Sequence, residues 1–363
     1  MAILIVIVFG QAFTSLSVFN PIKRNFEDFS MTDLYFNIIS NETDKKVNNN
    51  ITIVDISDQF KRGEIANTIS EIANQKPAII VIDVIFEGIK DDMGGNDSLA
   101  TAIINNKNVI VDMKLINYNE EENTFTSSIT SFFHEYSNVP YGYGNIPDNM
   151  EKHTIREYTI FQNLNGKKVF SLSSCAACGF LKQRPDTTNS DLIAIDYTPT
   201  LFPEINHSKI NENGNLIRDK IVMVGCLHEE SDMHYTPLGK MSGTELQAYM
   251  IQTQLSHKKM SSMNLWASML CGVLMCYLIV ALQNIILRNS NNYSTLFIDL
   301  SNFFFMALWA WIGFYAYERY NYYINLLYPL LGIALASVGR HWYAIMESLY
   351  RDIKKLSLVF KHK

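Results

Sequence analysis

Long stretches without a charged side chain occur at both ends of this 363-residue chain. Residues 1–22, 260–287 and 320–339 contain none, and residues 295–317 contain only Asp299. A helix needs about 20 predominantly apolar residues to cross the hydrocarbon core of a bilayer. The core of a soluble protein could bury one such helix but not a cluster of three. The sequence therefore predicts an integral membrane protein with about four transmembrane helices.

These stretches divide the chain into segments. The prediction is transmembrane helix 1 at residues 1–22, an extracytoplasmic domain at 23–259, transmembrane helix 2 at 260–287, transmembrane helix 3 at 295–317, transmembrane helix 4 at 320–339 and a basic cytoplasmic tail at 340–363. A cleaved signal peptide is the alternative for the first segment, although that segment lacks a basic n-region and a clear cleavage site.

Basic residues beside the spans predict the orientation, because Lys and Arg are retained on the cytoplasmic side. Residues 340–363 contain six basic residues against two acidic ones, which places this end in the cytoplasm and the large domain outside. Lys23 and Arg24 oppose this orientation, but Glu27 and Asp28 partly offset them.

The composition of the predicted outer domain excludes some functions. Residues 23–259 contain 32 acidic and 22 basic residues, a net charge of −10, so no nucleic-acid partner is expected. The domain has three cysteines, Cys175, Cys178 and Cys226, which are too few for a disulfide framework.

The outer domain alternates β-branched runs with helical patterns. Strands are predicted at Ile51–Ile56, Ala78–Phe86, Val109–Met113, Leu192–Tyr197 and Lys220–Gly225, with helices at Glu64–Ala73, Asp97–Asn105, Val169–Leu181 and Gly243–Ser256. Apolar strands that alternate with helices favour a parallel sheet covered on both faces. The predicted fold class is an α/β extracytoplasmic domain with a mainly parallel sheet, followed by membrane helices.

Two aspartates follow the first two predicted strands. Asp55 and Asp83 lie near the carboxyl ends of these strands, the edge where open parallel sheets bind ligands. They are either a carboxylate pair for a metal or for proton transfer, or residues that cap helices and order loops. The second interpretation is favoured.

Two further clusters have alternative interpretations. Cys175 and Cys178 form a CAAC motif that could be a redox couple, although the small residues around it favour a packed helix. His228, Asp232 and His234 could bind zinc, but their spacing matches no established metal motif. The sequence contains no Walker loop, GxSxG, HExxH or dinucleotide motif, so we expect no catalytic residue, metal or cofactor.

The order of these segments resembles the CHASE2 extracytoplasmic sensory domain of bacterial signalling proteins. The similar stretches are ITIVDIS at Ile51–Ser57, AIIVIDVIFEG at Ala78–Gly88, NDSLATAI at Asn96–Ile103, GKKVFSLSSCAA at Gly166–Ala177, LIAIDY at Leu192–Tyr197, and KIVMVGCLHEESDMHYTPLG with MSGTELQAYMIQTQL, which ends at Leu255. Residues that match the family pattern are Asp55, Asp83, Asp97, Arg156, Gly225, Asp232, Pro237, Gly243 and Glu245.

The resemblance implies one membrane helix before the domain and about three after it. This chain departs from the family in two places. A Trp-Pro-rich stretch with an arginine often follows the first strand in the family, whereas here only Arg62 remains, so a ligand pocket at that place is doubtful. Residues 340–363 are also too few for the kinase, cyclase or phosphatase that commonly follows the last membrane helix.

The predicted function is a non-enzymatic membrane sensor or receptor subunit of the bacterial inner membrane, multi-pass, with its large domain extracytoplasmic or periplasmic. It would signal to a separate membrane or cytoplasmic protein or act as a homo-oligomer. The alternative is a structural or scaffolding subunit of an envelope complex.

Two sets of residues are assigned to this function. Asp55, Asp83, Arg156 and Asp232 are candidates for ligand binding. Glu245, Asn284 and Asp299 are candidates for signal coupling, because helix Gly243–Ser256 should lead into the second span and polar groups within spans seek partners.

Overall fold

A computed structural model describes residues 33, 36, 45–90, 92–146, 154–185, 192–256, 261–288, 294–320, 322–324 and 326–361. These residues belong to two compact units, one at Asp33–Lys259 and one whose described part lies within Met260–Lys363. Predicted transmembrane helix 1 lies outside the described residues.

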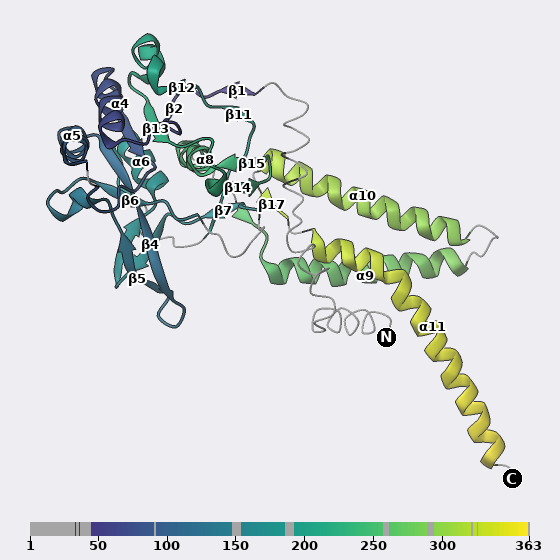
Figure 1. Cartoon of the computed structure of the whole chain (residues 1–363). Coiled ribbons are helices and arrows are strands. Elements are labelled where there is room, and N and C mark those ends of the chain that lie inside the picture. Colours follow the sequence, from purple (N-terminus) through teal and green to yellow (C-terminus); the bar gives the residue numbers. More distant parts are fainter. Residues whose placement is uncertain are drawn as a thin grey trace. The chain divides into compact units, whose positions relative to one another are not determined.

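The first unit is built around a nine-stranded sheet with the order β12-β2-β13-β3-β4-β5-β8-β9, in which β6 also pairs with β4 (Figure 1). The strands are β2 Ile51–Asp55, β3 Ile79–Ile82, β4 Val109–Asn119, β5 Thr124–Ile129, β6 Tyr141–Tyr143, β8 Phe161–Leu164, β9 Lys167–Phe170, β12 Glu204–Asn206 and β13 Ile221–Gly225. Four of the five predicted core strands are therefore present in this sheet.

The sheet is mixed, which corrects the expectation of a mainly parallel one. Parallel pairs join β12, β2, β13, β3, β4 and β6. However, β4 does not end near Met113 but continues to Asn119, where a hairpin reverses the chain into the antiparallel strand β5. Strands β8 and β9 form a second antiparallel pair.

Helices cover both faces of this sheet. Alternate residues of the central strands, such as Ile82, Val111 and Val224, pack in one core with α4 (Arg62–Asn74) and α5 (Met93–Ile104). Two helices lie on the opposite face, α6 (Leu172–Leu181) and α8 (Gly243–Leu255), as shown by contacts such as that between Gly179 of α6 and Ile110. The expectation of a sheet covered on both faces is thus confirmed.

The predicted core strand at Leu192–Tyr197 is wrong. Only β10 (Ile193–Ala194) forms, and it pairs with β7 (Glu157–Tyr158) in a separate two-stranded sheet. Tyr197 is nevertheless buried, because its ring packs against Phe36 and Tyr249 rather than against the central sheet. Further short pairs are β1 (Lys46–Val47) with β11 (Thr200–Leu201), and β14 (Met233–Thr236) with β15 (Gly239–Ser242).

The described part of the second unit contains three long helices, α9 (Leu265–Arg288), α10 (Ser294–Tyr320) and α11 (Leu327–Lys361). Residues Trp266–Arg288 and Leu296–Tyr320 are long and apolar enough to cross a membrane. These two helices correspond to predicted helices 2 and 3.

The region of predicted helix 4 differs from the expectation. Tyr322–Tyr323 form the short strand β17, which pairs with β16 (Ser261–Ser262), so the helix begins only at Leu327. It then continues past Gly339 to Lys361 without a break. The apolar part before Arg340 is therefore shorter than the predicted span, and two of the about four expected spans are supported by length and composition.

Close backbone packing joins α9 and α11. A Cβ atom on Gly332 would lie 2.2 Å from the carbonyl oxygen of Gly272, so only glycine fits at this crossing. Cys276, Ile279, Ile333 and Ala336 form a buried core between the same two helices. Small residues allow this kind of close approach between membrane helices, where packing replaces the hydrophobic effect.

Candidate functional site

A row of acidic residues crosses the carboxyl edge of the central sheet. Asp55 on β2 is opposite Gly225 on β13, and the registers Val224 with Ile82 and Ile82 with Val111 place Asp83 and Asp112 at the next position along their strands. Ile82, Val111 and Val224 face α4 and α5, and side chains alternate between the two faces of a sheet. The aspartates therefore face the α6 and α8 side together.

The amino end of α8 contacts this row. Thr244 Oγ1 donates a hydrogen bond of 2.7 Å to Asp83 Oδ2, and the Gly243 N–H donates one of 3.2 Å to Asp232 Oδ2. Ser242 caps the helix by accepting a bond from the Glu245 N–H. Gly225 makes room for this approach, since a Cβ atom there would lie 2.1 Å from Thr244 Oγ1. The N–H groups of the first turn, which have no acceptor within the helix itself, and the helix dipole favour negative charge at this place.

We name Asp83, Asp112, Asp232, Thr244 and Gln247 the acidic edge cluster. Its members come from β3, β4, the 3-10 turn η5 (Glu230–Asp232) and α8. Burial raises the pKa of Asp83 to about 6, an effect opposed by the Thr244 hydrogen bond and increased by Asp232. Burial also raises the pKa of Asp112 well above its usual range. The neighbouring charges of Asp83 and Asp232 add to that shift, and backbone hydrogen bonds from Gly144 and Met113 oppose it. Two neighbouring carboxyls in this cluster thus favour the neutral form more than surface carboxyls do.

Asp55 lies in the same row but behaves in the opposite way. Burial alone would raise its pKa, yet the hydrogen bonds from Ser57 and from the Leu227 N–H, together with His228, outweigh burial and lower it. The Ser57 hydroxyl and N–H donate to Asp55 Oδ1 at 2.5 Å and 3.0 Å. Asp55 therefore orders the loop that follows β13, in agreement with the interpretation that the sequence analysis favoured.

The two histidines predicted as possible zinc ligands contact different aspartates. His228 approaches Asp55 at 3.6 Å with an exposed side chain, whereas His234 approaches Asp232 at 3.3 Å. Among the described residues, no group of three or more His, Cys, Asp or Glu side chains is arranged to hold a metal ion.

The three cysteines of the domain are free thiols. Burial raises the pKa of Cys175 to about 12 and also raises that of Cys178. The Cys175 thiol donates to the Tyr141 carbonyl at 3.6 Å. Since the thiolate is the reactive form, this environment opposes a redox role for the CAAC motif.

Arg156 lies away from the acidic edge cluster. Its Nε donates to Asp33 Oδ1 at 2.9 Å, and one terminal nitrogen donates to Asp33 Oδ2 at 2.5 Å. This bidentate pair holds Asp33 against the domain, and Phe36 likewise packs its ring against Tyr197. The structure thus gives Arg156 an anchoring contact and does not bring it together with Asp55, Asp83 and Asp232.

The coupling residues predicted in the helices lie beside a polar network rather than in it. Gln283 of α9 donates to Asn302 of α10 at 3.1 Å and to Ser337 of α11 at 2.9 Å, and Asn302 donates to Ser337 at 3.0 Å. Asn284 and Asp299 are exposed on the same helices. Glu245 lies in the first turn of α8, where burial, followed by the nearby charge of Glu204, raises its pKa.

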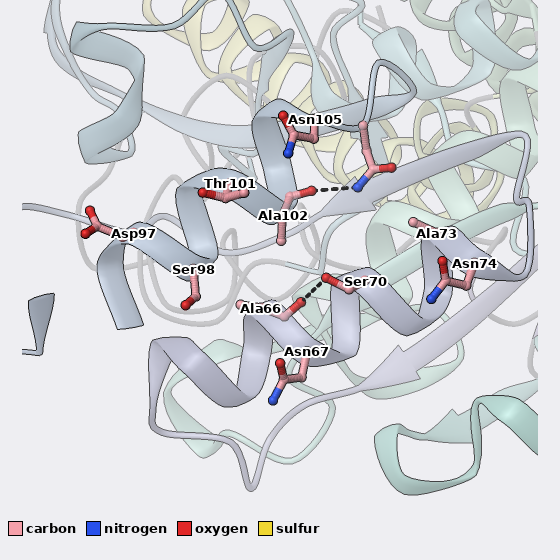
Figure 2. A pocket seen from close by; sticks show the side chains of 11 residues that line it. Ala66, Asn67, Ser70, Ala73, Asn74, Asp97, Ser98, Thr101, Ala102 and Asn105 are labelled. Carbon is pink, nitrogen blue, oxygen red and sulfur yellow. Dashed lines mark hydrogen bonds between the residues drawn. The ribbon is translucent and has the colours of Figure 1, made fainter. Parts of the chain in front are cut away.

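A groove lies between α4 and α5 and is drawn in Figure 2. It has a volume of about 550 Å³ and is lined by alanines and by polar side chains, among them Asn67, Asn74 and Thr101. Ser70 donates to the Ala66 carbonyl of its own helix (Figure 2), and Asn106, which follows α5, donates to the Ala102 carbonyl of that helix. Most of the polar side chains in this groove are exposed to water.

Arg62 does not line that groove. It is buried, with 3 % of its surface exposed, and donates to the carbonyl groups of Glu87 and Gly88 and to Asn96 Oδ1. Its guanidinium also lies 4.7 Å from the centre of the Phe132 ring. Arg62 therefore joins α4 to the chain after β3 and to α5.

Sequence reasoning missed Asp112, Thr244 and Gln247. A signal for Asp112 was present, because the runs that end in Asp55, Asp83 and Asp112 all place aspartate directly after β-branched residues. Asp112 was overlooked because its strand continues beyond it. No comparable pattern marks Gln247, whose place in the cluster depends on how α8 packs.

The comparison with known families agrees with this architecture. The sequence model of the CHASE2 domain matches residues 2–282, more than half of the chain. No curated protein and no solved structure matches the chain. CHASE2 domains are extracytoplasmic sensory domains, and two apolar helices follow the sheet domain in this sequence. The chain belongs to the CHASE2 domain family.

Proposed function

We propose that this chain is a non-enzymatic membrane sensor subunit of the bacterial inner membrane. Its outer domain detects a cue at the acidic edge cluster, and α8 transmits the change to the membrane helices. A separate membrane or cytoplasmic protein, or a second copy of the chain, then receives the signal. In this proposal the chain crosses the membrane several times and α11 ends in the cytoplasm, as its basic residues favour.

One observation carries the proposal: α8 has its amino end in the cluster, and its carboxyl end comes shortly before the apolar helix α9 along the sequence. At its amino end, Thr244 donates a hydrogen bond to Asp83 and the Gly243 N–H donates one to Asp232. The helix ends at Leu255, shortly before α9 begins at Leu265. Most residues of α8 are buried, including Leu246, Tyr249 and Ile251. A well-packed helix moves as a unit, so a change at one end shifts the other.

Contacts of α8 with the rest of the domain support the same role. Tyr249 stacks against Tyr197 and Phe202, and Tyr197 in turn contacts Phe36. Thr253 accepts a bond from the Asp196 N–H at 2.9 Å. Phe36, which precedes β1 in the sequence, and Tyr249 of α8 therefore belong to one aromatic cluster within the domain. The non-enzymatic part of the proposal rests on the family, whose domain is sensory.

Hydrogen–deuterium exchange on the full chain in lipid nanodiscs tests this proposal. Thr244→Val removes the bond to Asp83 while keeping the shape of the side chain. We expect faster exchange in α8 that extends into peptides covering Leu265–Arg288. Thr68→Val is the matched control, because the hydroxyl of this buried threonine of α4 donates to Gln59 Oε1, outside the acidic edge cluster. A change confined to the first turn of α8 would contradict transmission through this helix.

Purification of the chain in mild detergent, followed by identification of the proteins bound to it, distinguishes the sensor from the alternative role of a scaffolding subunit. A stoichiometric protein that stays bound whatever the state of the cluster would favour the scaffolding role. Binding that differs between the wild-type chain and Thr244→Val would favour the sensor.

A further inference from the structure

Acceptor atoms outnumber donors in the acidic edge cluster. Asp112 Oδ1 is buried and has no hydrogen-bond partner among the described residues. Gln247 is 2 % exposed, and its Oε1 likewise lacks a partner within the described part of the chain. Buried polar atoms are almost always paired, since an unpaired one costs about 1–3 kcal/mol. Two unpaired acceptors in one cluster therefore indicate that a donor is missing.

Gly144 brings these two acceptors to the same place. A Cβ atom on Gly144 would lie 2.4 Å from Asp112 Oδ1, so the carboxyl group rests directly on this glycine. The Gly144 carbonyl accepts a bond of 3.1 Å from Gln247 Nε2. This bond also fixes the orientation of the amide, because turning it over would set Gln247 Oε1 against the Gly144 carbonyl. Gln247 therefore offers an oxygen, not an N–H, to the cluster.

The surrounding groups add negative charge and no lysine or arginine. The charges of Asp232 and His234 act on Asp83, and those of Asp83 and Asp232 act on Asp112. Cys226, which follows β13, is in turn influenced by Glu229, Asp55, Asp232 and Asp83. Glu245 of α8 is influenced instead by Glu204 and Lys45. Among the described residues, His234 is the sole basic side chain whose charge acts on Asp83, and it already contacts Asp232 at 3.3 Å. Within the described part of the chain, the counter-charge of Asp83 therefore comes from this histidine and from the amino end of α8.

We propose that Asp83 and Asp112, with Gln247 as acceptor, form a proton-binding site through which the domain reads the pH outside the cytoplasm. When the site is protonated, the carboxyl O–H becomes the missing donor for a neighbouring acceptor oxygen. When the proton leaves to bulk water, the carboxyl becomes a carboxylate and both adjacent acids are charged. This inference rests on the proposed function only in taking α8 as the output.

The response of α8 follows from its contacts. Thr244 and Gln247 lie three positions apart on one face of the helix, and both reach into the cluster. Loss of the proton adds repulsion among Asp83, Asp112 and Asp232 and strengthens the attraction between these acids and the amino end of α8. Both effects act on the same helix, and its position is therefore coupled to the protonation of the pair.

Infrared titration of the full chain in detergent tests the site directly, because protonated carboxyl groups absorb apart from carboxylates. The wild-type chain should keep protonated carboxyl absorption well above pH 3.8 and lose it with a midpoint near pH 6 or higher. Asp83→Asn and Asp112→Asn should each remove or shift this late transition. Asp55→Asn is the matched control and should leave it unchanged, since the pKa of Asp55 is lowered.

Gln247→Met provides a second variant in case an aspartate substitution prevents folding. It removes the unpaired acceptor and keeps both carboxyls, so the midpoint of the late transition should move. Two results would overturn the proposal. One is that all protonated carboxyl absorption disappears at the pH where ordinary surface acids titrate, and the other is that the late transition persists in all three cluster variants.

The titration is repeated with a chelator and with excess Mg²⁺ or Ca²⁺. A midpoint lowered by either ion in the wild-type chain but not in Asp112→Asn would mean a cation site and would also overturn it.

These outcomes are distinct from failure of the proposed function. The titration measures protonation inside the domain, whereas the exchange experiment with Thr244→Val measures transmission along α8. A silent titration with intact transmission would leave the sensor role standing with another cue.

Discussion

The aspartates of the sheet edge have different roles although they share one row. Asp55 receives hydrogen bonds from Ser57 and Leu227, whereas Asp112 Oδ1 receives none from the described residues. Position along a strand therefore does not decide the charge state of a carboxyl group. The balance between burial, neighbouring charges and the N–H and O–H donors directed at it does.

Asp83 should make the domain less stable as the pH rises. Its pKa is raised from 3.8 to about 6 in the folded state, so its contribution to stability is fully present below pH 3.8 and is lost as the pH approaches 6. One pKa unit corresponds to about 1.4 kcal/mol. Asp83→Asn should remove this loss. The stability of the variant relative to the wild-type chain should therefore be higher at pH 7 than at pH 4, as measured by denaturant unfolding at a series of pH values.

Asp55→Asn should act with the opposite sign. The pKa of Asp55 is lowered on folding, so its contribution is present above pH 3.8 and is lost as the pH falls through the folded value. The variant should be less stable than the wild-type chain at pH 7 by about 1 kcal/mol, with the difference disappearing in acid. Equal pH profiles for both variants would show that the two environments do not differ as described.

At the scale of elements, the helix pair α4 and α5 depends on one buried cation. Arg62 supplies donors to Glu87, Gly88 and Asn96 from the first turn of α4. Arg62→Met fills a similar volume but leaves these three acceptors without their donor. The free energy of unfolding should fall by about 3 kcal/mol in denaturant titration.

The neighbouring Lys61 provides the control for this substitution. Its side chain is exposed, with an ion pair of 3.9 Å to Glu64, and Lys61→Met should change stability by less than about 0.5 kcal/mol. Similar losses for the two variants would mean that Arg62 acts through its charge at the helix start and not through its hydrogen bonds.

The elements that sequence reasoning located share a clear physical signature. The strands near Ile51, Ile80, Val109 and Val222 are continuous β-branched runs because both of their faces are covered. Strands β5 and β9 escaped detection because TFTSSI and KKVF mix polar and apolar residues. The run at Leu192–Tyr197 has the same apolar character as a core strand, but Leu192 is exposed, and Tyr197 is buried against Tyr249 of α8 instead of in the sheet.

The predicted site was recovered less completely than the fold. Asp83 and Asp232 both accept hydrogen bonds from the amino end of α8, a convergence that the sequence analysis did not predict, and their role in ligand binding stays a prediction. Arg156 instead pairs with Asp33, a contact between distant parts of the chain that no local pattern records. In the helices, Gln283 rather than its neighbour Asn284 faces the other two helices, because one position along a helix rotates a side chain by about 100°.

At the scale of the whole molecule, the orientation in the membrane remains a prediction. A cysteine that replaces Glu121, in the turn between β4 and β5, should react with a membrane-impermeant reagent in intact cells, whereas one that replaces Lys361 should react only after lysis. The exposed turn offers the reagent free access, so its failure to react would contradict an outer location. Equal labelling of both positions would exclude the proposed arrangement.

The central claim is that the acidic edge cluster controls the membrane helices through α8. It is tested most directly by the distance between spin labels on α9 and α10 in the full chain in nanodiscs, with the native cysteines replaced. Asp112→Asn and Thr244→Val should each shift the distribution of distances, whereas Ser70→Ala, in the groove between α4 and α5, should leave it unchanged. Identical distributions in all four chains would contradict the account.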